Sequence, residues 1–111
     1  MKLRITKSFR DRLNDQVEYI ANDKPGAARK FKNEIISRIK DIPKMPYANR
    51  KSIYFDRDDI RDMVIKGYLV VCKIDSEHQR IDVFGFTKYQ GIHLINNYWL
   101  QHAGILHGSV W

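Results

Sequence analysis

The feature that most constrains the fold is a change of hydrophobic period near residue 50. Before it, apolar side chains recur at helical spacing in two stretches, separated by a break at Asn22–Gly26. After it, apolar and polar residues alternate, as they do in strands that bury one face. A chain that changes period in this way favours a layer of helices packed on a sheet.

The N-terminal half predicts one strand and two helices. Lys2–Thr6 alternates like a strand, and Ser8 is predicted to open the first helix, with Asp11 placed close to a capping box. Pro25 suits the first turn of the second helix, because its missing N–H costs nothing there, and two prolines after residue 42 end that helix. So short a break between helices predicts an antiparallel hairpin. The expected core positions are Phe9, Leu13, Val17, Ile20 and Ala21, then Ala28, Phe31, Ile35, Ile39 and Ile42.

The C-terminal half predicts a meander of strands. The fold class is therefore α+β: an N-terminal strand, an antiparallel two-helix hairpin, then a three- to four-stranded mostly antiparallel sheet with the helices on one face. Residues 1–90 form the expected domain, and residues 91–111 form a C-terminal extension with a predicted helix over Ile92–Gln101. We expect strands at Ser52–Phe55, Ile60–Lys66, Tyr68–Ile74 and Arg80–Phe86, with turns at Gly67 and Asp75–Gln79.

Charge is distributed unevenly along the chain. Twenty Lys and Arg residues against thirteen Asp and Glu give a net charge of +7, and residues 1–51 carry +8 while residues 52–111 carry −1. A basic face made by the first half suits an acidic protein segment or a nucleic acid. The alternative is a solvated helix surface with extra lysines.

The same inspection points to a cytoplasmic protein. No apolar run approaches the roughly 18 residues that a membrane span needs. The charged N-terminus is not followed by the apolar stretch of a signal peptide. Cys72 is the one cysteine and alternates with Val70 and Ile74, which favours a buried, inert thiol in a reducing compartment.

Four segments carry a family resemblance: the entry to the second helix (Asp23–Phe31), its end (Ile39–Pro46), the hairpin (Ile60–Val71) and the final strand (Arg80–Phe86). In this order they resemble the RelE/ParE superfamily of type II toxins, and its ParE side more than its RelE side. The similarity covers most of residues 3–90. There are two departures: Cys72 stands where relatives often carry Tyr, and the apolar tail after Gln90 is longer than the family leads one to expect.

The resemblance implies a toxin that arrests growth and is neutralised by a separately encoded antitoxin. In this family the antitoxin wraps a helix along the toxin surface and sometimes adds a strand to its sheet, and the assembly is a homodimer or a heterotetramer with the antitoxin. A basic helical hairpin and an open sheet edge suit such an acidic, initially disordered partner. We expect the antitoxin to contact Arg10, Arg29, Lys30 and Arg38.

Two activities follow from the resemblance: inhibition of DNA gyrase, as in ParE-like members, or metal-independent cleavage of mRNA on the ribosome, as in RelE-like members. A non-toxic interaction module on the same fold is a third alternative. Neither a cofactor nor a metal is expected, since His78, His93, His102 and His107 do not form a convincing ligand set. Nuclease candidates are Arg50, Lys51, Arg57, Arg61, Lys88, Tyr89 and His93.

If the chain is RelE-like, the resemblance implies Arg61, Lys88 and Tyr89 as catalytic residues. Lys88 and Tyr89, just past the last strand, match the place where RelE-like members carry a basic residue and a Tyr. Basic groups there would stabilise a phosphorane and protonate the leaving oxygen. Each has a structural alternative: Arg61 pairing with a carboxylate such as Asp58, and a solvated Lys88 beside a half-buried Tyr89. A face that cleaves RNA should be strongly basic. Residues 56–62 instead contain four aspartates, which favours the gyrase-directed alternative.

Overall fold

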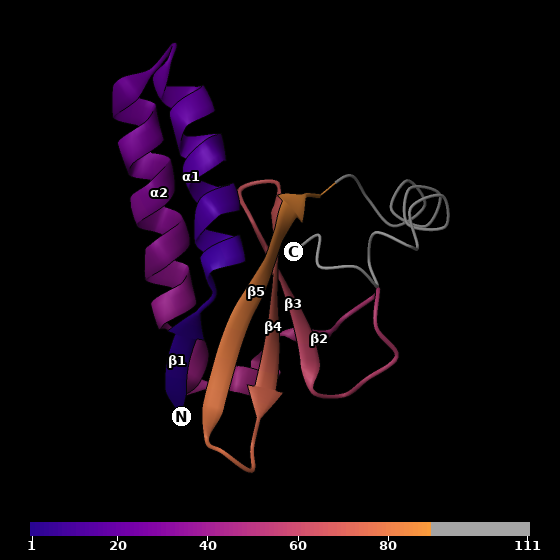
Figure 1. The fold of residues 1–111 in the computed structure, drawn as a ribbon. Coiled ribbons are helices and arrows are strands. Elements are labelled where there is room, and N and C mark those ends of the chain that lie inside the picture. The colour runs from indigo at the N-terminus through magenta and orange to yellow at the C-terminus, as the bar shows by residue number, and fades with distance from the viewer. Residues whose placement is uncertain (90–111) are drawn as a thin grey trace.

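The computed structural model describes residues 1–89, which form two layers. A hairpin of two helices lies against one face of a twisted sheet (Figure 1). We call the sheet face that the helices cover the inner face and the opposite one the outer face. The elements are β1 (Lys2–Ile5), α1 (Lys7–Ala21), α2 (Pro25–Lys40), the 3-10 turns η1 (Ile42–Lys44) and η2 (Pro46–Ala48), β2 (Arg50–Lys51), β3 (Ile60–Ile65), β4 (Tyr68–Asp75) and β5 (Arg80–Lys88).

The sheet has five strands in the order β1-β5-β4-β3-β2. All neighbours are antiparallel except β1, which runs parallel to β5 from the pair Lys2–Arg80 to the pair Ile5–Val83. The two-residue turn between β3 and β4 holds Lys66 and Gly67 at positive φ, as the tightest hairpins require. The predicted α+β fold is thereby confirmed, and the parallel pairing joins the N-terminus to the last strand.

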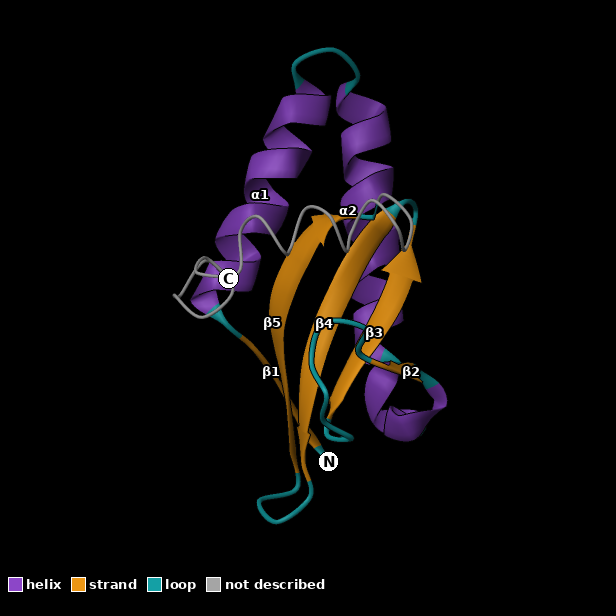
Figure 2. Ribbon diagram, turned by 90° about the vertical axis from the view of Figure 1, so that its right-hand side faces the viewer, coloured by secondary structure: helices purple, strands orange, loops and turns teal. Residues whose placement is uncertain are grey.

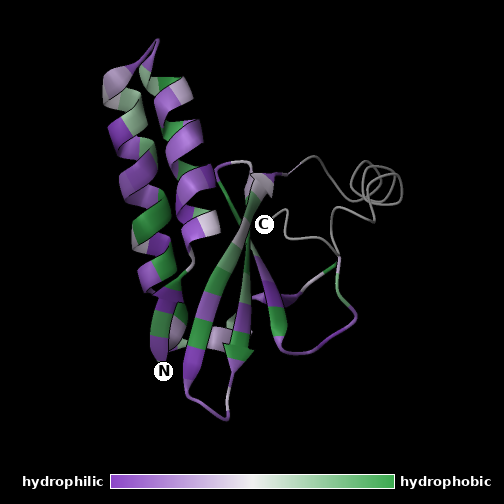
Figure 3. Cartoon of the chain, in the orientation of Figure 1, coloured by the Kyte–Doolittle hydropathy of each residue, from purple (hydrophilic) through white to green (hydrophobic). Residues whose placement is uncertain are grey.

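The predicted apolar stripes form the main core. Phe9 and Leu13 of α1 and four residues of α2 are buried against the inner face, and the stripes are visible along both helices (Figure 3). Four aromatic rings cross this interface in a row: Phe9 packs edge-on against Phe86, Phe86 stacks on Tyr68, and Tyr68 meets Phe31 edge-on. Such burial supplies most of the stabilisation that holds two layers together.

The start of α1 differs from the prediction. Thr6, not Ser8, is the N-cap: its hydroxyl accepts a hydrogen bond from the N–H of Phe9 at 3.2 Å. Asp11 closes no capping box, because its carboxylate pairs with Lys7 at 2.8 Å. The helix begins earlier because Thr6, directly after β1, both ends the strand and offers a hydroxyl to the first turn.

The predicted strand Ser52–Phe55 is wrong. The strand is Arg50–Lys51, and the chain then crosses the outer face as a loop (Figure 2). Side chains take the backbone N–H groups that a ladder would need: Asp62 accepts from Ile53 at 3.0 Å, and the Ser52 hydroxyl accepts from Tyr54 at 3.2 Å.

The predicted helix Ile92–Gln101 lies outside the described residues. Within residues 1–89, no helix is long and apolar enough to cross a bilayer.

Candidate functional site

The basic excess of the N-terminal half is concentrated on α2. α1 carries three basic and three acidic residues, whereas α2 carries five Lys or Arg and one Glu. That one acid, Glu34, is paired with Lys66 from the β3–β4 turn at 2.8 Å. α2 therefore carries a net charge of +4, half of the +8 of residues 1–51.

All four residues predicted to contact an antitoxin are exposed. Arg29, Lys30 and Arg38 lie on α2 and form no ion pair within residues 1–89, and Arg10 lies near the start of α1. Because the helices are antiparallel (Figure 1), Arg10 and Arg38 lie at the same end of the hairpin, while Arg29 and Lys30 lie toward its tip. The structure thus places the four along the length of the hairpin rather than at one point.

Arg61 is a braced side chain. Its guanidinium donates to the carbonyl oxygen of Asp58 at 3.0 Å, to the carboxylate of Asp58 at 2.7 Å and to the carbonyl oxygen of Asn49 at 3.1 Å. It also lies 5.0 Å from the ring centroid of Tyr47, and its side chain is 13% exposed. These contacts use much of the donor capacity of the guanidinium to fix β3 against η2 and the preceding loop.

The side chains of Lys88 and Tyr89 project to opposite faces of the sheet at the end of β5. Lys88 is exposed and pairs in register with Tyr68, so its side chain leaves on the inner-face side beside α1. Tyr89 packs against Phe84 on the outer face, with the guanidinium carbon of Arg50 5.6 Å from its ring centroid. Neighbouring residues on a strand project to opposite faces, so the two side chains diverge.

The three predicted catalytic residues are not brought together. Arg61 pairs with Cys72 and Lys88 pairs with Tyr68, which stand four residues apart on β4, roughly 13 Å along the strand. Of the other candidates, Lys51 pairs with Asp56 at 3.3 Å and Arg57 with Asp59 at 2.6 Å. His93 lies outside the described residues.

The outer face is apolar where the crossing loop lies on it. Buried Ile60, Leu69 and Val71 form its centre, and the partly buried aromatic rings around them are those of Tyr54, Phe55, Phe84 and Tyr89. Under this loop, the carboxylate of Asp62 is 2% exposed. Burial raises the pKa of Asp62, and hydrogen bonds from Ile53 and Ser52 only partly offset it. Asp62 anchors the loop, at the cost of a buried carboxylate.

Cys72 lies on the inner face and is buried, as its alternation with Val70 and Ile74 predicts. Burial raises the pKa of its thiol to about 11, so that the thiolate is scarce at neutral pH. Within residues 1–89, no group of three His, Cys, Asp or Glu side chains is placed to hold a metal ion.

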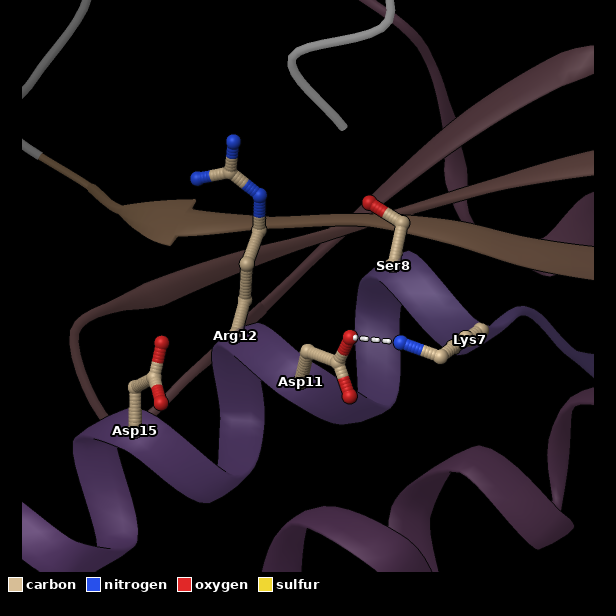
Figure 4. Close-up of a pocket in the computed structure, with 5 residues that line it drawn as sticks. All are labelled: Lys7, Ser8, Asp11, Arg12 and Asp15. Atoms are coloured by element: carbon tan, nitrogen blue, oxygen red, sulfur yellow. Dashed lines mark hydrogen bonds and ion pairs between the residues drawn. The ribbon is translucent and has the colours of Figure 1, made fainter.

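A groove beside α1 was not foreseen from the sequence. One face of the helix, at positions 8, 12, 15 and 19, lines two adjoining hollows that share Arg12 and Asp15. Figure 4 shows the first hollow, where Arg12 and Ser8 point toward the sheet and Asp11 is held by Lys7. The second is closed by the end of β5. We call both together the α1 groove; its lining is Lys7, Ser8, Asp11, Arg12, Asp15, Gln16, Tyr19, Tyr68, Phe86, Thr87 and Lys88.

The α1 groove runs beside a strand edge that no described residue pairs with. The N–H of Thr6 donates to the carbonyl oxygen of Val83, which is the last backbone bond from the N-terminal segment to β5. Tyr89 donates to Gly67 across the β3–β4 turn, so the alternation of the ladder points the backbone groups of Phe86 and Lys88 away from β4. An open edge of this kind is a template for an added strand.

Two features of the sequence point weakly to this groove. Tyr19 is a large side chain that is 73% exposed, and it continues the spacing of Arg12 and Asp15 along one helix face. The first strand is also shorter than the last, which predicts an unpaired remainder if the two are neighbours. Their pairing, however, joins positions nearly eighty residues apart and has no local signature.

Solved structures with this fold include chains from two bacterial toxin–antitoxin systems. The chain is similar to a chain of the chromosomal ParDE toxin–antitoxin system from P. aeruginosa, with a TM-score of 0.69 at 14% identity, covering 81% of this chain and 97% of that one. It is also similar to a mutant of the E. coli toxin RelE solved in complex with an antitoxin RelBc peptide, with a TM-score of 0.52 at 12% identity, covering 87% and 92%. At such identities these likenesses show the fold.

The family is shown by sequence. Residues 3–88 match the model of the ParE toxin of type II toxin–antitoxin systems, parDE. The chain therefore belongs to the ParE toxin family within the RelE/ParE superfamily. A search of curated protein sequences found no match.

Proposed function

We propose that this chain arrests growth by poisoning DNA gyrase and that a cognate antitoxin neutralises it. Membership of the ParE family supports the toxin assignment. The observation that favours gyrase over mRNA is the separation of the candidate catalytic groups: Arg61 is consumed by structural contacts, and Lys88 and Tyr89 leave opposite faces of β5. A protein that acts by binding needs no such constellation.

The test compares two targets in one preparation. Purified protein is added to gyrase with supercoiled DNA, and separately to translating ribosomes with a reporter mRNA. We expect accumulation of cleaved DNA and intact mRNA. Induced cells should show DNA damage as growth stops. Normal supercoiling and undamaged DNA in arrested cells would contradict the proposal, and growth unaffected by overexpression without antitoxin would favour a non-toxic interaction module.

A second candidate function is ribosome-dependent cleavage of mRNA. It is favoured by one observation: Tyr89, with the Arg50 guanidinium over its ring, is adjacent in sequence to an exposed Lys88 without an ion pair in the described part of the chain. The Tyr89 phenol and the Arg50 guanidinium beside it, both on the outer face, would serve acid–base chemistry at a phosphate. Loss of mRNA cleavage in both Lys88→Ala and Tyr89→Phe, with folding intact, would support it, whereas full toxicity in both would remove these assignments.

The antitoxin, in this proposal, lays an acidic helical segment along the hairpin. Arg29, Lys30 and Arg38 of α2 form no ion pair within residues 1–89, and Arg10 extends the cationic line onto α1. Charge reversal at Lys30 should raise the dissociation constant by about tenfold, because an attraction becomes a repulsion. The matched control is Lys2→Glu, which makes the same change on the outer face of the sheet. Equal losses in both variants would mean that only net charge matters.

The unpaired edge of β5 is the proposed site for an extended part of the same antitoxin. A strand added there would bond to the backbone of Phe86 and Lys88. Its alternate side chains would enter the α1 groove beside Tyr19 and Tyr68.

A further inference from the structure

A basic hollow lies where β1 and β5 begin, at the end of the sheet away from the Lys88 end of β5, on the outer face. It is lined by Lys2, Leu3, Arg4, His78 and Arg80. None of these residues belongs to the helical hairpin or to the α1 groove. Four of the five carry a nitrogen base or cation, and no carboxylate lines the hollow.

Sheet register brings these side chains together. Lys2 pairs with Arg80 and Arg4 pairs with Asp82, across the parallel ladder of β1 and β5. Leu3 and Ile5 pack toward the main core, so strand alternation sends Lys2 and Arg4 to the outer face. His78 comes from the β4–β5 turn, next to the start of β5. Cations that are distant in sequence thus share one corner.

Two carboxylates hold the cations in place from beside the hollow. One oxygen of Asp82 lies 3.1 Å from the Nε atoms of both Arg4 and Arg80, and the Asp82 side chain is 14% exposed. Asp75 accepts from the backbone N–H of His78 at 3.1 Å, and its other oxygen lies 2.8 Å from the His78 ring. Nη2 of Arg4 also lies 3.4 Å from the second oxygen of Asp82, and Nη2 of Arg80 lies 3.7 Å from Asp75. The Nη1 group of each guanidinium is left for a further ligand.

The corner retains a positive charge after these pairs are counted. Lys2, Arg4 and Arg80 outnumber the two aspartates by one, and Lys73, which pairs with Asp82 across β4 and β5, adds another cation. Lys2 has no ion pair with any residue from 1 to 89. A fixed pair of guanidiniums beside a mobile ammonium is the donor set that phosphate oxygens favour.

We propose that this hollow binds a phosphate group, supplied either by a nucleic-acid backbone or by free phosphate. Arg4 and Arg80 donate to the phosphate oxygens from one side, and Lys2 approaches as a point charge from the other. His78 also lines the hollow, so its ring signals should change when a phosphate binds. The site reads no base sequence, because phosphate contacts position a nucleic acid without specifying it.

The test follows the backbone amides of residues 2–4 and 78–80 and the ring signals of His78 by NMR during titration with sodium phosphate. Sodium chloride at matched ionic strength is the reference. We expect saturable shifts confined to this corner. Lys2→Gln and Arg4→Gln should each weaken binding by about tenfold, the usual effect of losing one charge-assisted hydrogen bond. Lys24→Gln, at the tip of the helical hairpin, makes a matched change in charge and should leave binding unaltered.

A second titration with a short DNA duplex distinguishes the two sources. Tighter binding of the duplex, weakened by the same two variants and by salt, identifies a nucleic-acid backbone as the ligand. Binding of inorganic phosphate without a gain for the duplex identifies free phosphate. Shifts that chloride reproduces, or that persist unchanged in both Lys2→Gln and Arg4→Gln, would overturn the proposal.

Discussion

At the scale of single residues, Arg61 has a side chain suited to catalysis, but its contacts are those of a structural residue. Its donors reach two backbone carbonyls and one carboxylate, and its plane lies over Tyr47. These contacts join β3 to the chain that precedes it. Removing the side chain leaves the carbonyl oxygen of Asn49 without this donor, so the loss exceeds that of an ordinary surface ion pair.

Arg61→Ala should therefore lower the free energy of unfolding by about 2 kcal/mol. Arg61→Lys should recover less than half of this, because an ammonium cannot donate as a fork. Chemical denaturation measures both. Arg57→Ala removes an exposed pair with Asp59 and should cost under about 1 kcal/mol. An Arg61→Ala variant of native stability that abolished activity would instead identify a functional role.

Asp62 gives a prediction with a definite dependence on pH. Its pKa in the folded protein is raised by burial, so the unfolded chain releases the proton more readily. A raised folded-state pKa contributes stability that is complete below the unfolded pKa, about 3.9, and is lost as pH rises through the folded value. The ionised carboxylate thus weakens the fold at neutral pH.

Asp62→Asn should remove this dependence while keeping an oxygen that accepts from Ile53. Relative to the variant, the natural protein should lose stability as pH rises above the unfolded pKa of about 3.9 and through the raised folded pKa. Urea denaturation across that range measures the difference. A gap between the two proteins that stays constant with pH would show that Asp62 does not titrate there.

At the scale of elements, the spacing of apolar residues predicted most of the helices and strands. The stripe from Ala28 to Ile39 identified α2 and its buried face, and alternation identified β3, β4 and β5 within a residue or two. The failures occurred where side chains compete for backbone groups. The Thr6 hydroxyl caps α1, so the helix begins before Ser8. Asp62 and Ser52 accept the N–H groups of Ile53 and Tyr54, so that segment does not pair as a strand.

The candidate sites were harder to predict than the elements. Exposed cations on α2 can be read from helical spacing alone. The α1 groove and the basic hollow both depend on the pairing of β1 with β5, which periodicity does not specify. The scattering of Arg61, Lys88 and Tyr89 depends on register and on a bulge at Phe84, where Val71 faces Gly85 and Cys72 faces Val83.

The open edge of β5 yields a prediction at this scale. The N–H of Lys88 points away from β4, so Lys88→Pro should leave the sheet ladder intact and change the free energy of unfolding by less than about 1 kcal/mol. It should weaken antitoxin binding by about tenfold or more, because a strand added there would lose a bond and meet the proline ring. Lys88→Ala, which keeps the N–H, is the control.

Hydrogen exchange of the backbone amides tests directly whether a strand is added at the β5 edge. The amides of Phe86 and Lys88 should exchange quickly in the free toxin and become protected when antitoxin binds, whereas the amide of Thr87, directed toward β4, should be protected in both states. Unchanged exchange at Phe86 and Lys88 in a saturated complex would exclude strand addition at this site and leave binding on the helical hairpin untouched.

At the scale of the whole molecule, charge is unevenly distributed over the surface. Most of the surplus sits on α2 and at the outer corner of β1, while the crossing loop over the outer face carries aspartates at 56, 58 and 59. The electrostatic potential therefore differs from one side of the surface to another, beyond what the net charge of +7 describes. A partner with an acidic segment would approach the helical side first and be repelled by the loop.

This asymmetry predicts how association should respond to salt. Raising ionic strength from about 0.05 to 0.5 M shortens the screening length several-fold, so the association rate constant with the antitoxin should fall by about tenfold. The dissociation rate should change little, because it depends on contacts already made. Stopped-flow measurements over this range provide both rates. Lys30→Glu should flatten the salt dependence, whereas Lys2→Glu, with the same net charge, should leave most of the slope. If both variants flatten it equally, total charge governs the encounter and α2 has no special part in it.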